Sequence, residues 1–214
     1  MTRFLLISFI LILPSTANAV TIGLGYSNSE AQIKCTPPNK EYNSRINFKV
    51  QQFANTYRPE VIKKYLSKIV FCNKLWLHGF AWPRGTYSLK GKMIFVEIDG
   101  HNDTAHMLHH EFSSILLFST NKLNRSKWKS FNGDKYIHNW RLIHMGWKDD
   151  SKIQKNGFLY PYSQQDLEND FNVMAGLYLP NVPNYNDRLK KARRYPRING
   201  KYLLLRDFYK GLLR

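Results

Sequence analysis

The segment HMLHHEFSSILLF, residues 106–118, decides how the rest of this chain is interpreted. Three histidines and a glutamate stand inside a run of apolar residues, and this pattern predicts a buried helix. Residues four apart share one face of a helix, so His106 and His110 can hold one metal ion through two imidazoles. Glu111 lies about 100 degrees further round the axis, where it can act as general base on a metal-bound water. The alternative is a buried helix that carries histidines for structural reasons.

A second helix with acidic residues is predicted at SQQDLENDFNVMAGLYL, residues 163–179. Apolar residues recur there at helical spacing, and Ser163 is the predicted cap, with Asp166 three residues later. A catalytic zinc needs a third protein ligand, and this helix offers the carboxylates of Glu168 and Asp170. The alternative for both acids is a capping or solvated role in the first turn.

The remaining chain mixes short helical and strand-like patterns, which predicts an α+β fold. Residues 20–45 show no periodic pattern and are predicted to be irregular. A helix is predicted to start near Pro59, which suits a first-turn position, within the segment YRPEVIKKYLSKI, residues 57–69. Residues 69–77 follow as one strand, and residues 86–98 as a hairpin around Lys90-Gly91 whose second run is an inner strand.

Positive charge dominates the chain, with 32 Lys and Arg against 15 Asp and Glu. Two basic helices are predicted near the C-terminus, and residues 188–214 hold ten Lys or Arg and one acid, Asp207. Such a surface attracts polyanions, so an anionic component of the cell envelope is an expected partner, and nucleic acid a less favoured one. The alternative is a solvated basic face that keeps the protein soluble.

The first residues, MTRFLLISFILILPSTANA, have the layout of a secretory signal peptide. We therefore expect residues 1–19 to be removed and the protein to be periplasmic or secreted, with an uncleaved N-terminal anchor as the alternative. Residues 20–214 then form a single domain without a transmembrane span. Its parts are an N-terminal arm, a core and a basic helical tail, at residues 20–58, 59–180 and 181–214.

The chain has two cysteines, Cys35 and Cys72. In an oxidising compartment such a pair can close a disulfide, and the alternative is two buried thiols. Two cysteines are too few for a zinc site made of thiolates alone.

The order of motifs between residues 59 and 180 resembles a zincin-type metallopeptidase domain, in particular its gluzincin-like members. The matching pieces are WPRGTYSLKGKMIFVEI, LHHEFSSILL, GFLYPYSQQD and LENDFNVMAGLYL. The resemblance implies a small sheet packed on an active-site helix, a zinc cofactor, and a protein or peptide substrate. The basic helical tail adds to this domain.

The resemblance also assigns roles within the family's His-Glu-x-x-His motif. It implies His110 as the first zinc ligand, Glu111 as the general base and Glu168 as the carboxylate ligand. Ser114 stands where the second histidine belongs. Tyr162 is then a candidate to donate a hydrogen bond to an oxyanion, and ordinary aromatic packing is its alternative.

Ser114 leaves three interpretations open, because a serine hydroxyl is a poor zinc ligand. The metal site can use His106 together with His110, one helical turn earlier. It can instead keep His110 and the carboxylate ligand and recruit a distant residue, such as His138 or His144. In the third interpretation the chain has lost its metal and kept the fold.

Three functions follow from these interpretations. The first is an exported zinc metallopeptidase that hydrolyses peptide bonds through a metal-bound water. The second is an inactive protein of the same fold that binds polyanions through its basic tail. The third, phosphodiester cleavage with His110 and Glu111 as acid-base groups, is supported by no recognised nuclease motif.

Overall fold

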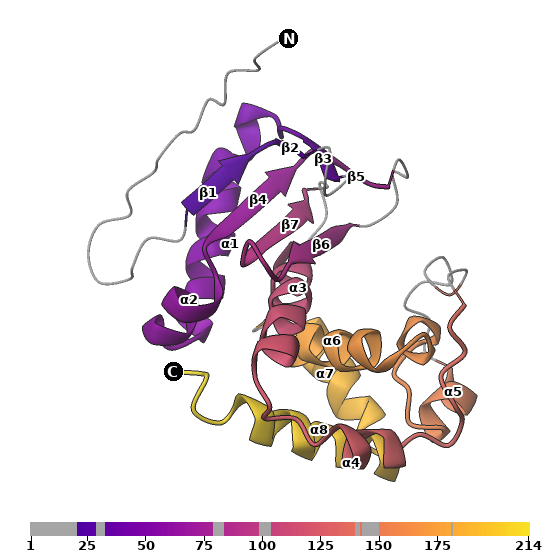
Figure 1. The fold of residues 1–214 in the computed structure, drawn as a ribbon. Coiled ribbons are helices and arrows are strands. Elements are labelled where there is room, and N and C mark those ends of the chain that lie inside the picture. The colour runs from indigo at the N-terminus through magenta and orange to yellow at the C-terminus, as the bar shows by residue number, and fades with distance from the viewer. Residues whose placement is uncertain are drawn as a thin grey trace. The chain divides into compact units, whose positions relative to one another are not determined.

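The computed structural model describes residues 21–28, 33–78, 84–98, 104–139, 142, 150–180 and 182–214. The predicted signal peptide, His101 and His144 lie outside the described residues. The chain divides into two compact units, of which the first ends at Leu108 and the second runs from His109 to Arg214. Sheets and helices are both present, as Figure 1 shows, so the predicted α+β class is confirmed.

The first unit is built on two small sheets. One has the strand order β1-β4-β7-β6, and the other has the order β2-β3-β5. The strands are β1 (Thr21–Leu24), β2 (Tyr26–Asn28), β3 (Ile33–Thr36), β4 (Lys68–Cys72), β5 (Lys74–Leu77), β6 (Gly85–Ser88) and β7 (Met93–Glu97). Strand β4 pairs in parallel with both β1 and β7, and β6 pairs with β7 in an antiparallel hairpin. The predicted hairpin is confirmed, and β7 is the inner strand that was expected.

The helices of the first unit are η1 (Lys40–Tyr42), α1 (Asn43–Thr56) and α2 (Pro59–Tyr65). The helix predicted from Pro59 is confirmed, with the proline in its first turn, but it ends at Tyr65. Lys68 and the residues after it belong to β4 instead. A buried strand and a buried helical turn have similar apolar content, so the apolar pattern does not locate the boundary between them.

Two predictions for the first unit are wrong. Residues 20–45 are not irregular, because they hold three strands, η1 and the start of α1. Each of these strands has only three or four residues. Such short strands form through pairing with distant strands, which local periodicity does not reveal. Residues 69–77 are two strands in different sheets, and Asn73 between them donates its backbone N–H to the Thr36 carbonyl at 2.8 Å.

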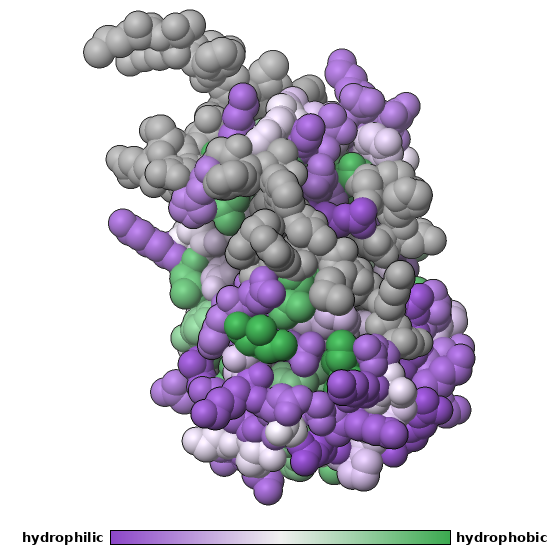
Figure 2. Space-filling model, turned by 90° about the vertical axis from the view of Figure 1, so that its right-hand side faces the viewer, coloured by the Kyte–Doolittle hydropathy of each residue, from purple (hydrophilic) through white to green (hydrophobic). Residues whose placement is uncertain are grey.

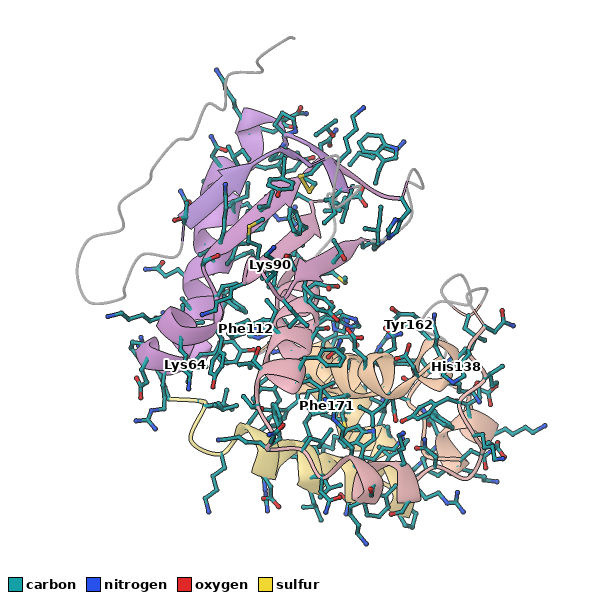
Figure 3. All side chains as sticks on the ribbon, viewed as in Figure 1. Lys64, Lys90, Phe112, His138, Tyr162 and Phe171 are labelled. Carbon is teal, nitrogen blue, oxygen red and sulfur yellow. A yellow bond between two sulfur atoms is a disulfide. The ribbon has the colours of Figure 1, made fainter. Side chains whose placement is uncertain are left out.

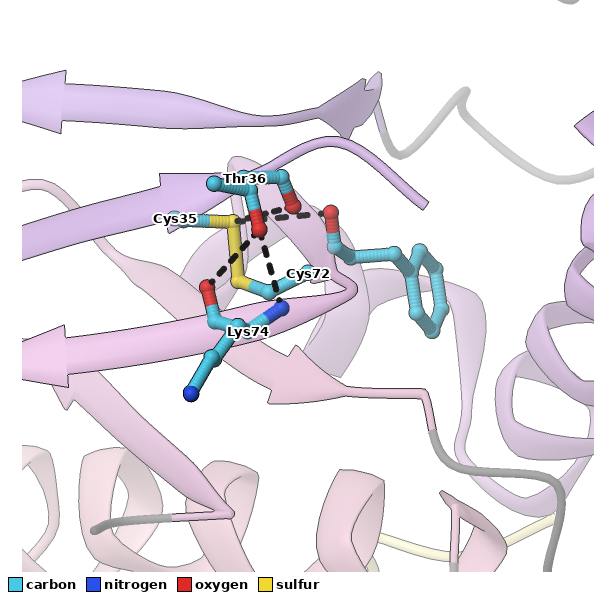
Figure 4. The surroundings of a disulfide bond; sticks show 5 residues. Cys35, Thr36, Cys72 and Lys74 are labelled. Atoms are coloured by element: carbon cyan, nitrogen blue, oxygen red, sulfur yellow. Dashed lines mark hydrogen bonds between the residues drawn. A yellow bond between two sulfur atoms is a disulfide. The ribbon is translucent and has the colours of Figure 1, made fainter. Parts of the chain in front are cut away.

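A disulfide between Cys35 and Cys72 joins the two sheets of the first unit, from β3 to β4 (Figure 4). Both cysteines are buried in a cluster that includes Val70, Leu75 and Phe95. The disulfide, which the sequence left open, is therefore formed, and it closes a loop with a sequence separation of 37 residues.

We expect the replacement of both cysteines by alanine to lower the free energy of unfolding by about 3–4 kcal/mol, because the unfolded chain loses a cross-link across a long loop. Urea denaturation of the two proteins measures the difference. Reduction of the natural chain should produce a similar loss. A chain whose unfolding midpoint is unaffected by reductant would contradict this assignment.

The second unit is helical. Its elements are α3 (Thr104–Ser119, which starts in the first unit), α4 (Arg125–Ser130), α5 (Ser151–Lys155), η3 (Pro161–Gln164), α6 (Leu167–Tyr178), α7 (Pro183–Ala192) and α8 (Pro196–Tyr209). The predicted helix at residues 106–118 and the two basic C-terminal helices are confirmed. None of the described helices is long and apolar enough to span a membrane.

The start of α6 differs from the prediction. Asp166 is the N-cap, and its Oδ1 accepts a hydrogen bond of 2.7 Å from the backbone N–H of Asn169. Ser163 lies in η3 instead. Both residues are good caps, and the choice between them depends on where η3 ends.

Candidate functional site

Helix α3 carries His106, His109, His110 and Glu111 within a run of apolar residues. Phe112, Ile115 and Leu116 are fully buried along it, which explains why the helix forms within the core. The polar residues His110 and Glu111 are also nearly inaccessible, with 6 % and 5 % of their surface exposed. Buried polar groups need partners, so the neighbours of these side chains determine their chemistry.

Ser114 connects α3 to α6. Its hydroxyl donates a hydrogen bond of 2.7 Å to Oε1 of Glu168. The Ser114 Oγ itself accepts a hydrogen bond of 2.6 Å from Nδ2 of Asn172. Glu168 and Asn172 are four residues apart on α6 and therefore share the face that meets Ser114.

Glu111 and Glu168 influence each other. Burial raises the pKa of the Glu111 carboxyl well above its ordinary value, and the nearby charge of Glu168 raises it further. Burial also raises the pKa of the Tyr162 hydroxyl, with further contributions from Glu111, Asp166 and Glu168. The phenol of Tyr162 therefore stays protonated at neutral pH and can donate a hydrogen bond.

Tyr162, which Figure 3 labels, reaches the cluster from η3. Its ring stacks near His110, with ring centroids 6.2 Å apart and planes inclined by 15°. Four residues proposed from the sequence, His110, Glu111, Tyr162 and Glu168, thus come together in the second unit.

The histidines proposed as replacement ligands lie elsewhere. His106 is buried on α3, eight residues before Ser114, which corresponds to about 12 Å of rise along a helix. Glu168 contacts α3 at the level of Ser114, one turn beyond His110. His138 is an exposed loop residue whose backbone N–H donates to the Gln165 carbonyl at 3.2 Å (Figure 3).

Asp170 lies on α6 but does not face Ser114. Its Oδ2 accepts hydrogen bonds from three side chains, namely Lys201 Nζ at 2.6 Å, Trp128 Nε1 at 2.8 Å and the Tyr136 hydroxyl at 3.0 Å. Burial raises the pKa of the Asp170 carboxyl, and the Lys201 ammonium with the two other donors acts in the opposite direction.

Lys201 is fully buried on α8, with 0 % of its surface exposed. Besides its ion pair with Asp170, its ammonium donates to the Gly157 carbonyl at 2.6 Å and lies 4.5 Å from the Phe158 ring centroid. Sequence reasoning missed this residue and Asn172. The available signal was that Lys201 continues the apolar spacing of Ile198 and Leu205 on one helical face.

The comparisons with known proteins bear on the family and on the fold. Residues 85–210 match the model of a family described as "Putative zinc-binding metallo-peptidase". The chain belongs to this metallopeptidase family. The resemblance drawn from the motif order is therefore confirmed.

A solved relative supports the fold of this family member. The crystal structure of a putative zinc-binding metallo-peptidase from Bacteroides caccae aligns with a TM-score of 0.55 and 14 % sequence identity. The alignment covers 86 % of this chain and 74 % of that chain. No curated protein matches the chain. At this identity the likeness shows the fold, and the chemistry must be argued from the residues present.

The residues that the sequence resemblance assigns to the ligand positions do not fit a three-ligand zinc site. They are one imidazole, one hydroxyl and one carboxylate, from His110, Ser114 and Glu168. Zinc is held in proteins by imidazole, thiolate and carboxylate groups, whereas here the Ser114 hydroxyl donates a hydrogen bond to the Glu168 carboxylate. Among the described residues, no group of three His, Cys, Asp or Glu side chains is placed to hold a metal ion.

The Lys201–Asp170 pair should matter strongly for stability. We expect Lys201→Met to lower the free energy of unfolding by about 3–5 kcal/mol, because it leaves the buried Asp170 charge without its cation. Chemical denaturation measures the loss. The double variant Lys201→Met with Asp170→Leu removes both charges and should recover most of it. If the double variant is no more stable than Lys201→Met, the pair is not what stabilises this region.

Proposed function

We propose that this metallopeptidase-family protein binds peptides at the His110–Glu168 cluster, outside the cytoplasm, and does not hydrolyse them through zinc. The observation that carries the proposal is the 2.7 Å hydrogen bond from Ser114 to Glu168. It joins two positions that would both hold the metal in the family's motif. The N-terminal signal-like segment supports export.

This hydrogen bond matters because Ser114 stands at one expected ligand position and occupies the carboxylate of Glu168 at another. With Ser114 in place of histidine, the site keeps one imidazole and one carboxylate. Asn172 donates to Ser114 Oγ, so the hydroxyl proton is directed toward Glu168. Oε1 of the Glu168 carboxylate is thereby engaged by a protein hydroxyl.

The same cluster suits recognition of a peptide. A peptide backbone offers N–H donors and carbonyl acceptors. Tyr162 supplies a phenolic donor for a peptide carbonyl, and the Glu168 carboxylate is an acceptor for a peptide N–H. Both side chains are partly exposed and within reach of solvent.

The second candidate function is zinc-dependent hydrolysis of peptide bonds. His106 and His110 are both buried on α3 and four residues apart, which is the spacing for two imidazoles on one metal ion. Zinc held at this level, with a carboxylate or other ligand, would leave Glu111 next to the metal. The zinc content of the purified protein distinguishes this arrangement from peptide binding without zinc.

We expect the purified natural protein to contain much less than one zinc per chain and to show no peptidase activity that a chelator abolishes. Ser114→His supplies the missing imidazole and should raise zinc content to about one per chain. Ser114→Ala, the matched control, removes the hydrogen bond without adding a ligand and should stay free of zinc. Elemental analysis after dialysis against zinc measures all three proteins.

The opposite result would be stoichiometric zinc in the natural protein. Loss of that zinc in both His106→Ala and His110→Ala would then establish the hydrolytic alternative. Zinc that depends on neither histidine would be bound elsewhere.

Peptide binding is tested separately with a mixed peptide digest, using Tyr162→Phe. Removal of one hydrogen bond should weaken retention by about 3–10-fold, and the matched control Tyr65→Phe in the first unit should not. Equal retention by the natural protein and Tyr162→Phe would remove Tyr162 from the binding site. Absence of retention by the natural protein would remove the proposed function.

A further inference from the structure

Helices α4 and α8 pack on the same side of α6. Trp128 of α4 and Lys201 of α8 both donate to one oxygen of Asp170. Two further contacts join the helices at their ends. Lys122 Nζ, before α4, donates to the Lys210 carbonyl after α8 at 3.0 Å, and the Phe131 ring after α4 fills the space beside Gly200 of α8. The helices therefore run side by side in opposite directions, as Figure 1 shows.

The exposed positions of these two helices and of the residues next to their paired ends make up a surface that we call the basic face. Its exposed cations are Lys122, Arg125, Lys127, Lys129, Arg206 and Lys210. Asp207 is an exposed acid on the same part of α8. Figure 2 shows hydrophilic side chains crowding the lower part of its view, where the second unit is drawn. The face therefore carries a large excess of positive charge.

Two large apolar side chains are exposed among these cations. Leu203 on α8 and Phe118 at the end of α3 have 39 % and 41 % of their surface exposed. The guanidinium of Arg125 lies 5.4 Å from the Phe118 ring centroid and donates to the Leu117 carbonyl at 3.2 Å. Phe118 therefore adjoins α4.

We propose that the basic face binds the surface of an anionic lipid bilayer. Lys and Arg side chains attract lipid phosphates, while partly exposed apolar groups enter the interface between headgroups and acyl chains. Leu203 has no stacking surface for nucleic acid bases, and the Phe118 ring is already beside a guanidinium. The combination of cations with an exposed leucine fits a lipid surface better than a nucleic acid.

The geometry of α6 keeps this surface apart from the peptide-binding cluster. Asp170 lies two residues from both Glu168 and Asn172, which places it about 200 degrees from Glu168 around the helix axis. Glu168 and Asn172 meet α3, whereas Asp170 meets α4 and α8. A protein held by its basic face would leave the cluster turned away from the lipid, so the inference does not rest on the proposed peptide binding.

The test is sedimentation of the full chain with vesicles of phosphatidylcholine, prepared with and without phosphatidylglycerol. We expect binding only to the anionic vesicles, and a steep loss as salt is added. The charge-reversal variant combines Lys127→Glu, Arg206→Glu and Lys210→Glu. It should lower the partition coefficient at least about 30-fold, because each cation near an anionic surface contributes strongly.

A matched variant separates the basic face from net charge. It combines Lys40→Glu, Lys63→Glu and Lys90→Glu, which are exposed positions of the first unit with the same total change. This variant should retain at least about one third of the natural partition coefficient. Leu203→Ser should weaken binding several-fold without changing its salt dependence. Circular dichroism verifies that every variant is folded.

Several results would overturn the proposal. They are equal binding to neutral vesicles, an equal loss of binding in both charge-reversal variants, and no binding to anionic vesicles. If a DNA duplex binds through the basic face and anionic vesicles do not, the surface recognises nucleic acid instead.

Discussion

The second unit depends on one buried carboxylate. Asp170 accepts hydrogen bonds from Trp128, Tyr136 and Lys201, and so connects α6 to α4, α8 and the loop after α4. A charge buried at this depth is tolerated only when it is paired and hydrogen-bonded. The three donors therefore constrain the rotation of α6, and that rotation directs Glu168 and Asn172 toward α3.

The opposite side of α6 meets Ser114, which stands where the resemblance to the family places the second histidine of the motif. The neighbouring groups on α6 are hydrogen-bonded to this serine. Ser114 donates to Glu168 and accepts from Asn172, so the donor and acceptor capacity of the hydroxyl is used. Family membership thus describes the fold, whereas the residues present form a hydrogen-bonded cluster of Ser114, Glu168 and Asn172.

The helix α6 also separates two surfaces with different chemistry. One side contributes to a partly buried cluster of carboxylates, an imidazole and a phenol. The other side supports helices whose outer residues are mostly cationic. Because the two sides differ by about half a turn, contact with one surface need not block the other. A protein that binds peptides beside a lipid surface would use such a division.

By itself, the sequence determined the features that depend on neighbouring residues. The helix at residues 106–118, the hairpin around Lys90-Gly91, and the basic C-terminal helices follow from local periodicity and turn residues. The motif order also indicated the metallopeptidase family and predicted one site that contains His110, Glu111, Tyr162 and Glu168. The tertiary structure alone decided the partners of Ser114 and Asp170. Ser114 bonds to Glu168, which lies 54 residues later, and Asp170 bonds to Lys201, which lies 31 residues later. Local patterns specify which face of an element is buried, but the pairing of distant polar groups depends on how the elements pack.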